Sequence, residues 1–144
     1  MSNQTKHFLL IDDDPLNNSL SKLVLRKTLG KVEVIDFLVP ENGLEFIEFK
    51  SNYHSEEEKV TLLLDINMPS MTGWEFLDKF DQFKNSLKEQ FNIYILSSSI
   101  DPCDISRAKE NPLVIDFIEK PLNKASLNKI FESQLKPEIP FADN

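Results

Sequence analysis

Cysteine, long apolar runs and positive charge are all scarce in this chain of 144 residues. Its one cysteine, Cys103, excludes an internal disulfide and a Cys-x-x-Cys metal pair. The apolar run near the N-terminus, residues 8–11, is too short for a signal-peptide core or a membrane-spanning helix. We therefore expect a cytoplasmic protein with a reduced thiol and no membrane insertion.

The deficit of positive charge also restricts the function. Lysine and arginine number 16 against 24 aspartates and glutamates, which leaves a formal net charge of -8. Proteins that bind DNA on their own take much of their affinity from basic contacts to phosphates, so we expect no direct nucleic-acid binding. Hydrophobic residues make up 40% of the chain and include 11 phenylalanines, enough for one core. We expect one domain over residues 1–136 and a tail over 137–144.

Five short apolar runs have the length and composition of buried β-strands. They occupy residues 8–11, 32–39, 60–64, 93–96 and 113–118. Each run is followed by a stretch with the spacing of a helix. This alternation predicts an α/β fold, with a parallel sheet and helices on both of its faces.

The first helical stretches have recognisable starts. Asp14 and Pro15 predict the N-cap and first residue of a helix that ends at Gly30. In that helix four apolar residues recur at helical spacing: Leu16, Leu20, Leu23 and Val24. Residues 40–43 predict a turn, and the apolar residues of a short helix follow it: Leu44, Phe46, Ile47 and Phe49.

Further helices are expected in the second half, after an acidic surface loop at residues 51–59. One follows Gly73 and carries five apolar residues on one face: Phe76, Leu77, Phe80, Phe83 and Leu87. Another starts at Pro102 and runs to about residue 111, and its weak apolar stripe is typical of a surface helix. The last predicted helix is capped by Asn123, and four of its apolar residues are expected to face the core: Leu127, Ile130, Phe131 and Leu135.

Polar residues follow the expected strands at the points where they end. Residues 12–14, three aspartates, follow the first strand, and Asp65 follows the third. Ser97 follows the fourth strand and Lys120 the fifth. In a parallel sheet flanked by helices the ligand site lies at the carboxyl ends of the strands, so these groups should converge.

Their chemistry suits phosphoryl transfer to a carboxylate. Carboxylates that converge repel one another unless a cation is bound, and an all-oxygen acidic site suits Mg²⁺. Lys120 adds a second positive charge, and Ser97 adds a hydroxyl donor. Asp65 is the natural nucleophile, because it follows the most apolar strand and is the central acid.

Four segments together resemble the receiver domain of two-component response regulators. They are residues 10–14, residues 64–69 with Gly73, residues 96–98, and residues 120–121. The resemblance extends over about residues 6–135. It implies a flavodoxin-like (βα)5 fold, with a doubly wound five-stranded parallel sheet in the order 2-1-3-4-5.

The resemblance also implies roles for the acidic residues. Asp65 resembles the phosphoryl acceptor of the family. Asp12 and Asp13 resemble the pair that holds Mg²⁺ together with the acceptor, with Asp13 the more direct ligand. Asn67 would contribute its backbone carbonyl to the metal.

Four residues near the last two strands resemble the family's switch. Ser97 resembles the hydroxyl residue that bonds the phosphoryl group, although residues 97–99 also fit an ordinary polar loop. Lys120 resembles the lysine that pairs with the acceptor, and Pro121 would follow it in a cis peptide. Phe117 stands at the place of a switching aromatic, and a plain core position suits it equally.

The implied function is a single-domain response regulator rather than an enzyme with a separate substrate. It would promote only its own phosphorylation and dephosphorylation. The phosphoryl donor would be a sensor histidine kinase or a phosphotransfer protein, and a downstream protein would read the result. The changed surface would cover roughly residues 101–135. We expect a monomer or a weak homodimer.

Several alternatives were weighed against this interpretation. Asp14 fits a simple helix cap, and an EF-hand loop fails because Leu16 and Leu23 stand at ligand positions. A phosphatase of the haloacid-dehalogenase kind needs an acid/base two residues after its nucleophile, where this chain has Asn67. A degenerate receiver that only binds a partner remains open. A transcription factor is not expected, because no helix-turn-helix fits after residue 135.

Overall fold

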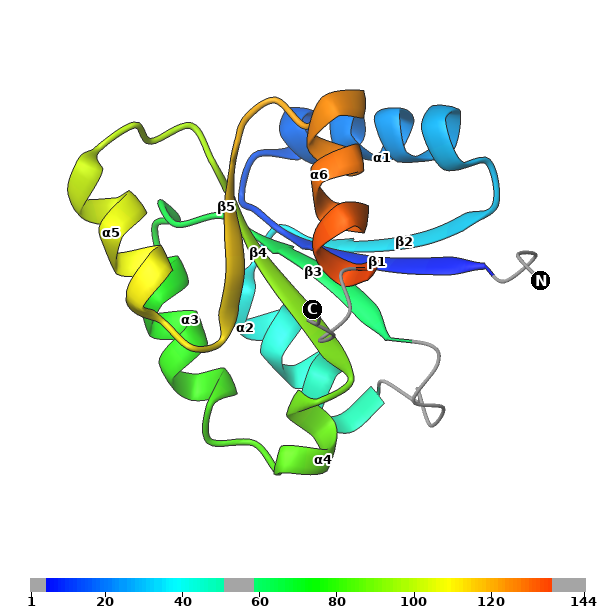
Figure 1. Ribbon diagram of the computed structural model, residues 1–144. Helices are drawn as coiled ribbons and strands as arrows, with labels where there is room; N and C mark the ends of the chain where they lie inside the picture. The colour runs from blue at the N-terminus through cyan, green and yellow to red at the C-terminus, as the bar shows by residue number, and fades with distance from the viewer. Residues whose placement is uncertain (1–4, 51–58, 136–144) are drawn as a thin grey trace, which may run out of the picture.

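The computed structural model describes residues 5–50 and 59–135. Within them a single parallel sheet has the strand order β2-β1-β3-β4-β5, as the resemblance implied (Figure 1). Its strands are β1 (Lys6–Ile11), β2 (Val32–Phe37), β3 (Val60–Leu64), β4 (Phe91–Ser97) and β5 (Val114–Glu119). The α/β prediction and the flavodoxin-like topology are confirmed.

Helices cover both faces of the sheet (Figure 1). The helices on one face are α1 (Pro15–Leu29) and α6 (Lys124–Leu135). On the other face lie α2 (Pro40–Glu45), α3 (Gly73–Phe80) and α5 (Pro102–Glu110), together with one π-helical turn at Phe46–Lys50 and the short α4 (Asn85–Lys88). Among the described residues no helix has both the length and the apolarity to cross a bilayer.

The core follows from the alternation of side chains along the central strands. Phe8 and Leu10 of β1 pack toward α1 and α6, whereas Leu9 and Ile11 pack toward α2 and α3. All five residues of β3 are buried, because this strand has a neighbour on each side and helices above and below. Asp65 directly follows this fully buried strand, so its backbone is held by the core of the sheet.

Three expectations need correction. Residues 40–43 form the start of α2 instead of a turn, because a proline fits the first helical position. The helix expected from Gly73 to Leu87 is divided into α3 and α4, and Phe83 and Leu87 still pack against the core. The second strand ends at Phe37 instead of residue 39.

Helix α1 forms as predicted, with the Asp14 side chain accepting a hydrogen bond from the Leu16 N–H. Its apolar stripe, however, faces outward: three leucines are 47–65% exposed, namely Leu16, Leu20 and Leu23. The sheet is instead contacted by a more polar face that includes Asn18, Ser21 and Leu25. Residues 51–58 of the loop predicted at 51–59, and the tail predicted at 137–144, lie outside the described residues.

Candidate functional site

The polar residues predicted at the strand ends converge at the carboxyl edge of the sheet. Asp12 follows β1, Asp65 follows β3, and Lys120 follows β5. Each of three carboxylates, those of Asp12, Asp13 and Asp65, offers an oxygen within 4.8 Å of the others. This acidic cluster could hold a metal ion.

Backbone hydrogen bonds continue the sheet beyond the strand ends and fix these residues. The Asp65 N–H donates to the Ile11 carbonyl at 2.9 Å, and the Asp12 N–H donates to the Phe37 carbonyl at 3.2 Å. The Lys120 N–H donates to the Ser97 carbonyl at 2.9 Å. Main-chain hydrogen bonds therefore hold the backbones of these residues in fixed relative positions, in addition to any side-chain contact.

The Asp12 carboxylate is buried, and both of its oxygens have partners within the chain. Its Oδ1 accepts the Asp14 N–H at 2.9 Å. Its Oδ2 accepts the Asn17 side-chain amide at 2.8 Å and lies 2.7 Å from the Lys120 ammonium. The sequence analysis did not identify Asn17 as a site residue. Its position in the first helical turn after the three aspartates was a signal that could have indicated this contact.

A second layer of polar contacts supports Asp12 from beneath α1. The Asn18 side-chain amide donates to the Asp12 backbone carbonyl at 3.1 Å and to the Asp36 carboxylate at 3.2 Å. Asp36 is paired in turn with Lys22 at 2.6 Å. These bonds explain why a polar residue occupies the buried face of the helix.

Among the described residues, the pKa of Asp65 is displaced most clearly from its ordinary value. Burial is the main cause and, with the nearby negative charge of Asp12, raises its pKa to about 6. Lys120 acts in the opposite direction from 3.6 Å and lowers the pKa of Asp65. Burial has the opposite effect on Lys120 and lowers its pKa. The hydrogen bond with Asp12 and the negative charges of Asp65 and Asp12 outweigh burial, so the pKa of Lys120 lies above its usual value. A second cation would relieve the charge that remains.

Gly73 is needed for the close approach of α3 to Asp65. A Cβ at this position would lie 2.5 Å from the Asp65 carbonyl oxygen. The Gly73 N–H donates to the Ile66 carbonyl at 2.8 Å, and Thr72 caps the helix in a reciprocal pair with Glu75. The glycine in the predicted motif therefore allows α3 to pack against the Asp65 backbone.

The remaining predicted residues lie around this cluster. The Ser97 side chain is fully buried, and its Oγ accepts the Ser99 N–H at 3.1 Å. The Lys120–Pro121 peptide is cis, as expected. Asn67 is exposed, and the role of its backbone carbonyl stays a prediction.

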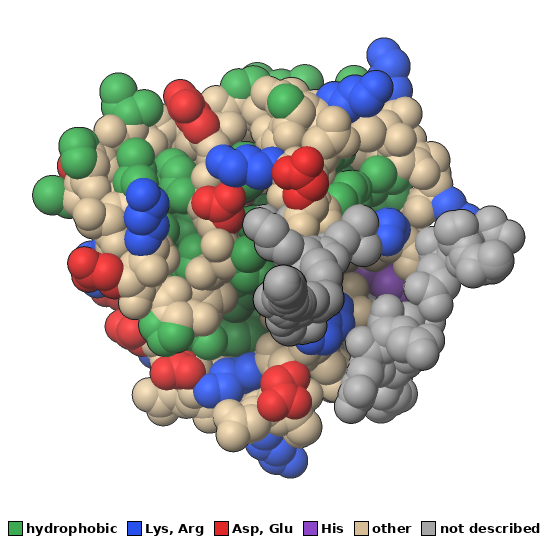
Figure 2. All heavy atoms as spheres, viewed as in Figure 1, with side chains coloured by type: hydrophobic (Ala, Val, Ile, Leu, Met, Phe, Trp, Pro, Cys, Tyr) green, Lys and Arg blue, Asp and Glu red, His purple; other side chains and the backbone are tan. Residues whose placement is uncertain are grey.

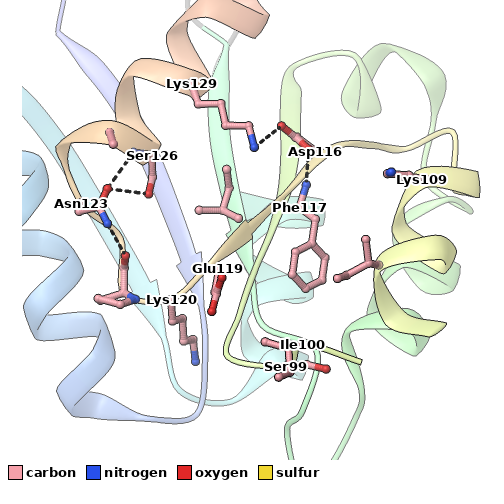
Figure 3. Close-up of a pocket in the computed structure, with 14 residues that line it drawn as sticks. Ser99, Ile100, Lys109, Asp116, Phe117, Glu119, Lys120, Asn123, Ser126 and Lys129 are labelled. Carbon is pink, nitrogen blue, oxygen red and sulfur yellow. Dashed lines mark hydrogen bonds and ion pairs between the residues drawn. The ribbon is translucent and has the colours of Figure 1, made fainter. Parts of the chain in front are cut away.

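Phe117 is half-buried and lines a cavity of about 570 Å³. In Figure 3 its ring points along the cavity toward Ser99 and Ile100. The cavity is bounded by α5, β5 and the start of α6. Figure 2 shows apolar atoms gathered in this part of the surface, with acidic and basic side chains around them.

Comparison with known proteins points to one family. A family model described as the response regulator receiver domain matches residues 8–132. Two-component response regulator ARR5 of Arabidopsis thaliana is 29% identical over 137 residues, covering 92% of this chain and 72% of the relative. Two-component response regulator ORR11 of Oryza sativa is 28% identical over 129 residues, covering 90% of this chain and 80% of the relative.

Solved structures agree with this result. The two-component response regulator from Cytophaga hutchinsonii is 28% identical and has a TM-score of 0.80, covering 94% of this chain and 100% of its own. The chemotaxis response regulator CheY4 of Vibrio cholerae is 21% identical with a TM-score of 0.70, covering 92% of this chain and 100% of its own. At that identity the second likeness shows the fold alone.

Proposed function

The chain belongs to the response regulator receiver family, and from that premise we propose that Asp65 accepts a phosphoryl group from a histidine kinase or phosphotransfer protein. Receiver domains are signalling domains of two-component phosphorelays. The observation that carries the proposal is the convergence of the buried Asp65 with Asp12, Asp13 and Lys120. No observation favours the phosphatase alternative, since Asn67 stands where that class needs an acid/base.

The donor set fits Mg²⁺. Asp12, Asp13 and Asp65 would each provide a carboxylate oxygen, and Asn67 would add its backbone carbonyl. When bound, the metal supplies positive charge that offsets the carboxylate repulsion and the charge of the incoming phosphoryl oxygens. Lys120 supplies the second positive charge from the chain itself, held at 2.7 Å from Asp12 and 3.6 Å from Asp65.

The chemical step uses Asp65 as the nucleophile. One carboxylate oxygen forms a bond to phosphorus as the bond from phosphorus to the donor nitrogen breaks, and the electron pair of that bond leaves with the imidazole. Lys120 is placed to pair with the phosphoryl group once Asp65 has lost its negative charge. Ser97 would donate its hydroxyl proton to a phosphoryl oxygen after moving toward Asp65.

The exposed stripe on α1 suits the approach of a protein donor. Leu16, Leu20 and Leu23 are spaced along one side of a helix that begins directly after Asp12 and Asp13. Such a row matches the apolar face of another helix. We propose that the phosphohistidine-bearing helix of the donor packs there, which brings its imidazole to the carboxyl edge of the sheet.

The output would be read at the cavity between α5, β5 and α6, where Phe117 borders the surface. A turn of Phe117 into the space vacated by Ser97 would change this face for a downstream protein. The expectations of a monomer or weak homodimer and of a cytoplasmic location remain part of the proposal. The single cysteine is consistent with a reducing compartment.

Intact-mass analysis tests the acceptor. Incubation with acetyl phosphate and Mg²⁺ should add one phosphoryl mass to the wild type, and the addition should be absent from Asp65→Asn. Asp116→Asn is the matched control, because this aspartate lies on β5 outside the acidic cluster. Undiminished labelling of Asp65→Asn, or equal loss in both variants, would refute the assignment.

A further inference from the structure

The loop between β4 and α5 carries hydrogen bonds that the proposed phosphoryl transfer does not need. Its first bond lies next to the candidate switch residue, where the Ser97 Oγ accepts the Ser99 N–H at 3.1 Å. A hydroxyl that accepts one hydrogen bond can still donate its own proton, so this bond is compatible with a later contact to a phosphoryl group. It does, however, tie the position of Ser97 to that of Ser99.

The Ser99 side chain connects the loop to α5. Its Oγ donates to the Asp104 Oδ2 at 2.8 Å and accepts the Asp101 N–H at 3.2 Å. Asp104 belongs to the first turn of α5, and Asp101 caps the helix by accepting the Cys103 N–H at 2.9 Å. A continuous series of hydrogen bonds therefore runs from the Ser97 hydroxyl to the first turn of α5.

Helix α5 is anchored to the core by few buried side chains. Ala108 is its one buried residue, so few apolar contacts resist a small displacement. Ile105 of this helix lines the same cavity as Ser99 and Phe117. A shift of the first turn would therefore alter the face that borders this cavity.

We propose that Ser99 and Asp104 form a latch, which holds Ser97 in its resting position and carries its displacement into α5. The latch rests on the proposed acceptance of a phosphoryl group by Asp65. If Ser97 moves toward Asp65, the Ser99 N–H must follow its acceptor or lose it. The hydrogen bond from the Ser99 hydroxyl to the Asp104 carboxylate is comparatively strong, because its acceptor is charged. When Ser99 follows Ser97, this bond therefore pulls the first turn of α5 with it.

Three variants isolate the latch. Ser99→Ala removes the hydroxyl, Ser99→Thr keeps it, and Asp104→Asn keeps an acceptor oxygen without the charge. Ser70→Ala is the matched control, because Ser70 also lies at the carboxyl edge and donates from its hydroxyl to a carboxylate, that of Glu41, at 3.1 Å. All four should keep the circular dichroism spectrum of the wild type.

The resting protein gives the first measurement. Amide hydrogen exchange across α5 should become about threefold faster in Ser99→Ala, the size expected for one weakened local hydrogen bond. Asp104→Asn should lie between Ser99→Ala and the wild type, while Ser99→Thr and Ser70→Ala should match the wild type. Unchanged exchange in Ser99→Ala, or an equal increase in Ser70→Ala, would overturn the latch.

Beryllofluoride with Mg²⁺, a mimic of a phosphoryl group on a carboxylate, gives the second measurement. In the wild type, chemical shifts should change both around Asp65 and across α5. In Ser99→Ala the changes around Asp65 should persist, those in α5 should shrink, and beryllofluoride should bind about threefold tighter because the restraint on Ser97 is gone. Full-sized α5 changes in Ser99→Ala would overturn the latch alone, whereas a wild type with no response at all would overturn the proposed function.

Discussion

Helices α3 and α5 are both short and lie on the same face of the sheet, and each comes after a strand with a candidate site residue at its carboxyl end: Asp65 directly after β3, and Ser97 as the last residue of β4. They differ in how they are held. Helix α3 buries five residues, listed here in chain order: Gly73, Trp74, Phe76, Leu77 and Phe80. Helix α5 buries only Ala108. The helix that follows the proposed acceptor is therefore anchored by several buried side chains, whereas the helix that follows the candidate switch residue is anchored by one.

This division suits a signalling domain. As the proposed acceptor, Asp65 would need a constant geometry, because its carboxylate would have to contact a metal, a lysine and an incoming phosphoryl group at once. The Gly73 contact at the Asp65 backbone and the buried face of α3 provide that constancy. A surface that a partner reads must instead have more than one arrangement, which weak anchoring of α5 permits.

The largest expected effect comes from truncating one apolar side chain in each helix. Phe76→Ala should lower the free energy of unfolding by about 3–5 kcal/mol, because it leaves a large cavity in the core. Ile105→Ala, at a half-buried position of α5, should cost about 1 kcal/mol. Urea unfolding measures both values, and equal costs would show that the two helices are anchored alike.

The second effect concerns the negative charge of Asp65, the residue that lies against α3. Because burial and Asp12 raise the pKa of Asp65 to about 6, its ionised form destabilises the fold. Asp65→Asn should therefore raise the free energy of unfolding at about pH 7, by on the order of 2 kcal/mol. Asp116→Asn, on the half-buried edge strand β5, should show no such gain.

The pH dependence of this gain follows from the direction of the shift. Below about pH 4, Asp65 is protonated in both the folded and the unfolded chain, so the substitution should have little effect. As the pH rises from about 4 to about 6 the unfolded chain ionises first, and the penalty in the wild type grows. Above about pH 6 the full penalty is present. A gain from Asp65→Asn that stays constant from acid to neutral pH would contradict this account.

The third effect compares the two helix caps. Thr72→Ala removes the reciprocal cap of α3 and should cost about 1 kcal/mol of global stability, since α3 is part of the core. Asp101→Ala removes the side-chain cap of α5, but should mainly speed local hydrogen exchange in α5. Denaturant unfolding combined with amide exchange separates a global from a local loss. A global cost of equal size for Asp101→Ala would remove the proposed difference.

The sequence could predict which residues form the acidic cluster because the signals for them are local. Asp12, Asp65 and Lys120 each follow a short apolar run directly, and the rule for parallel sheets places such residues at one edge. The sheet order and the roles of these residues came from the family resemblance. The position of each residue directly after its apolar run was sufficient to predict that it lies at the carboxyl edge of the sheet, and no individual long-range contact had to be predicted.

What the sequence could not show depends on tertiary placement. Leu16, Leu20 and Leu23 have the spacing of a buried face, yet α1 turns Asn18 inward because its amide meets the Asp12 carbonyl and Asp36. The bond from Ser99 to Asp104 likewise depends on how the loop enters α5. The division of the helix after Phe80 also required the folded chain, where Phe83 packs edge-on against Phe80.

The smallest effect concerns the contact that joins the two helices. The Arg107 guanidinium of α5 lies 4.9 Å from the centre of the Trp74 ring in α3. Because Arg107 is exposed, Arg107→Ala should cost only about 0.5 kcal/mol of global stability. Trp74 is the chain's one tryptophan, so its fluorescence reports this contact directly and should change in the variant.

Lys109→Ala, an exposed cation two residues along α5, is the matched control. If the contact restrains α5, exchange of its amides should rise in Arg107→Ala and stay unchanged in Lys109→Ala. A stability loss above about 2 kcal/mol would show instead that α5 is anchored to α3 as firmly as α3 is to the sheet.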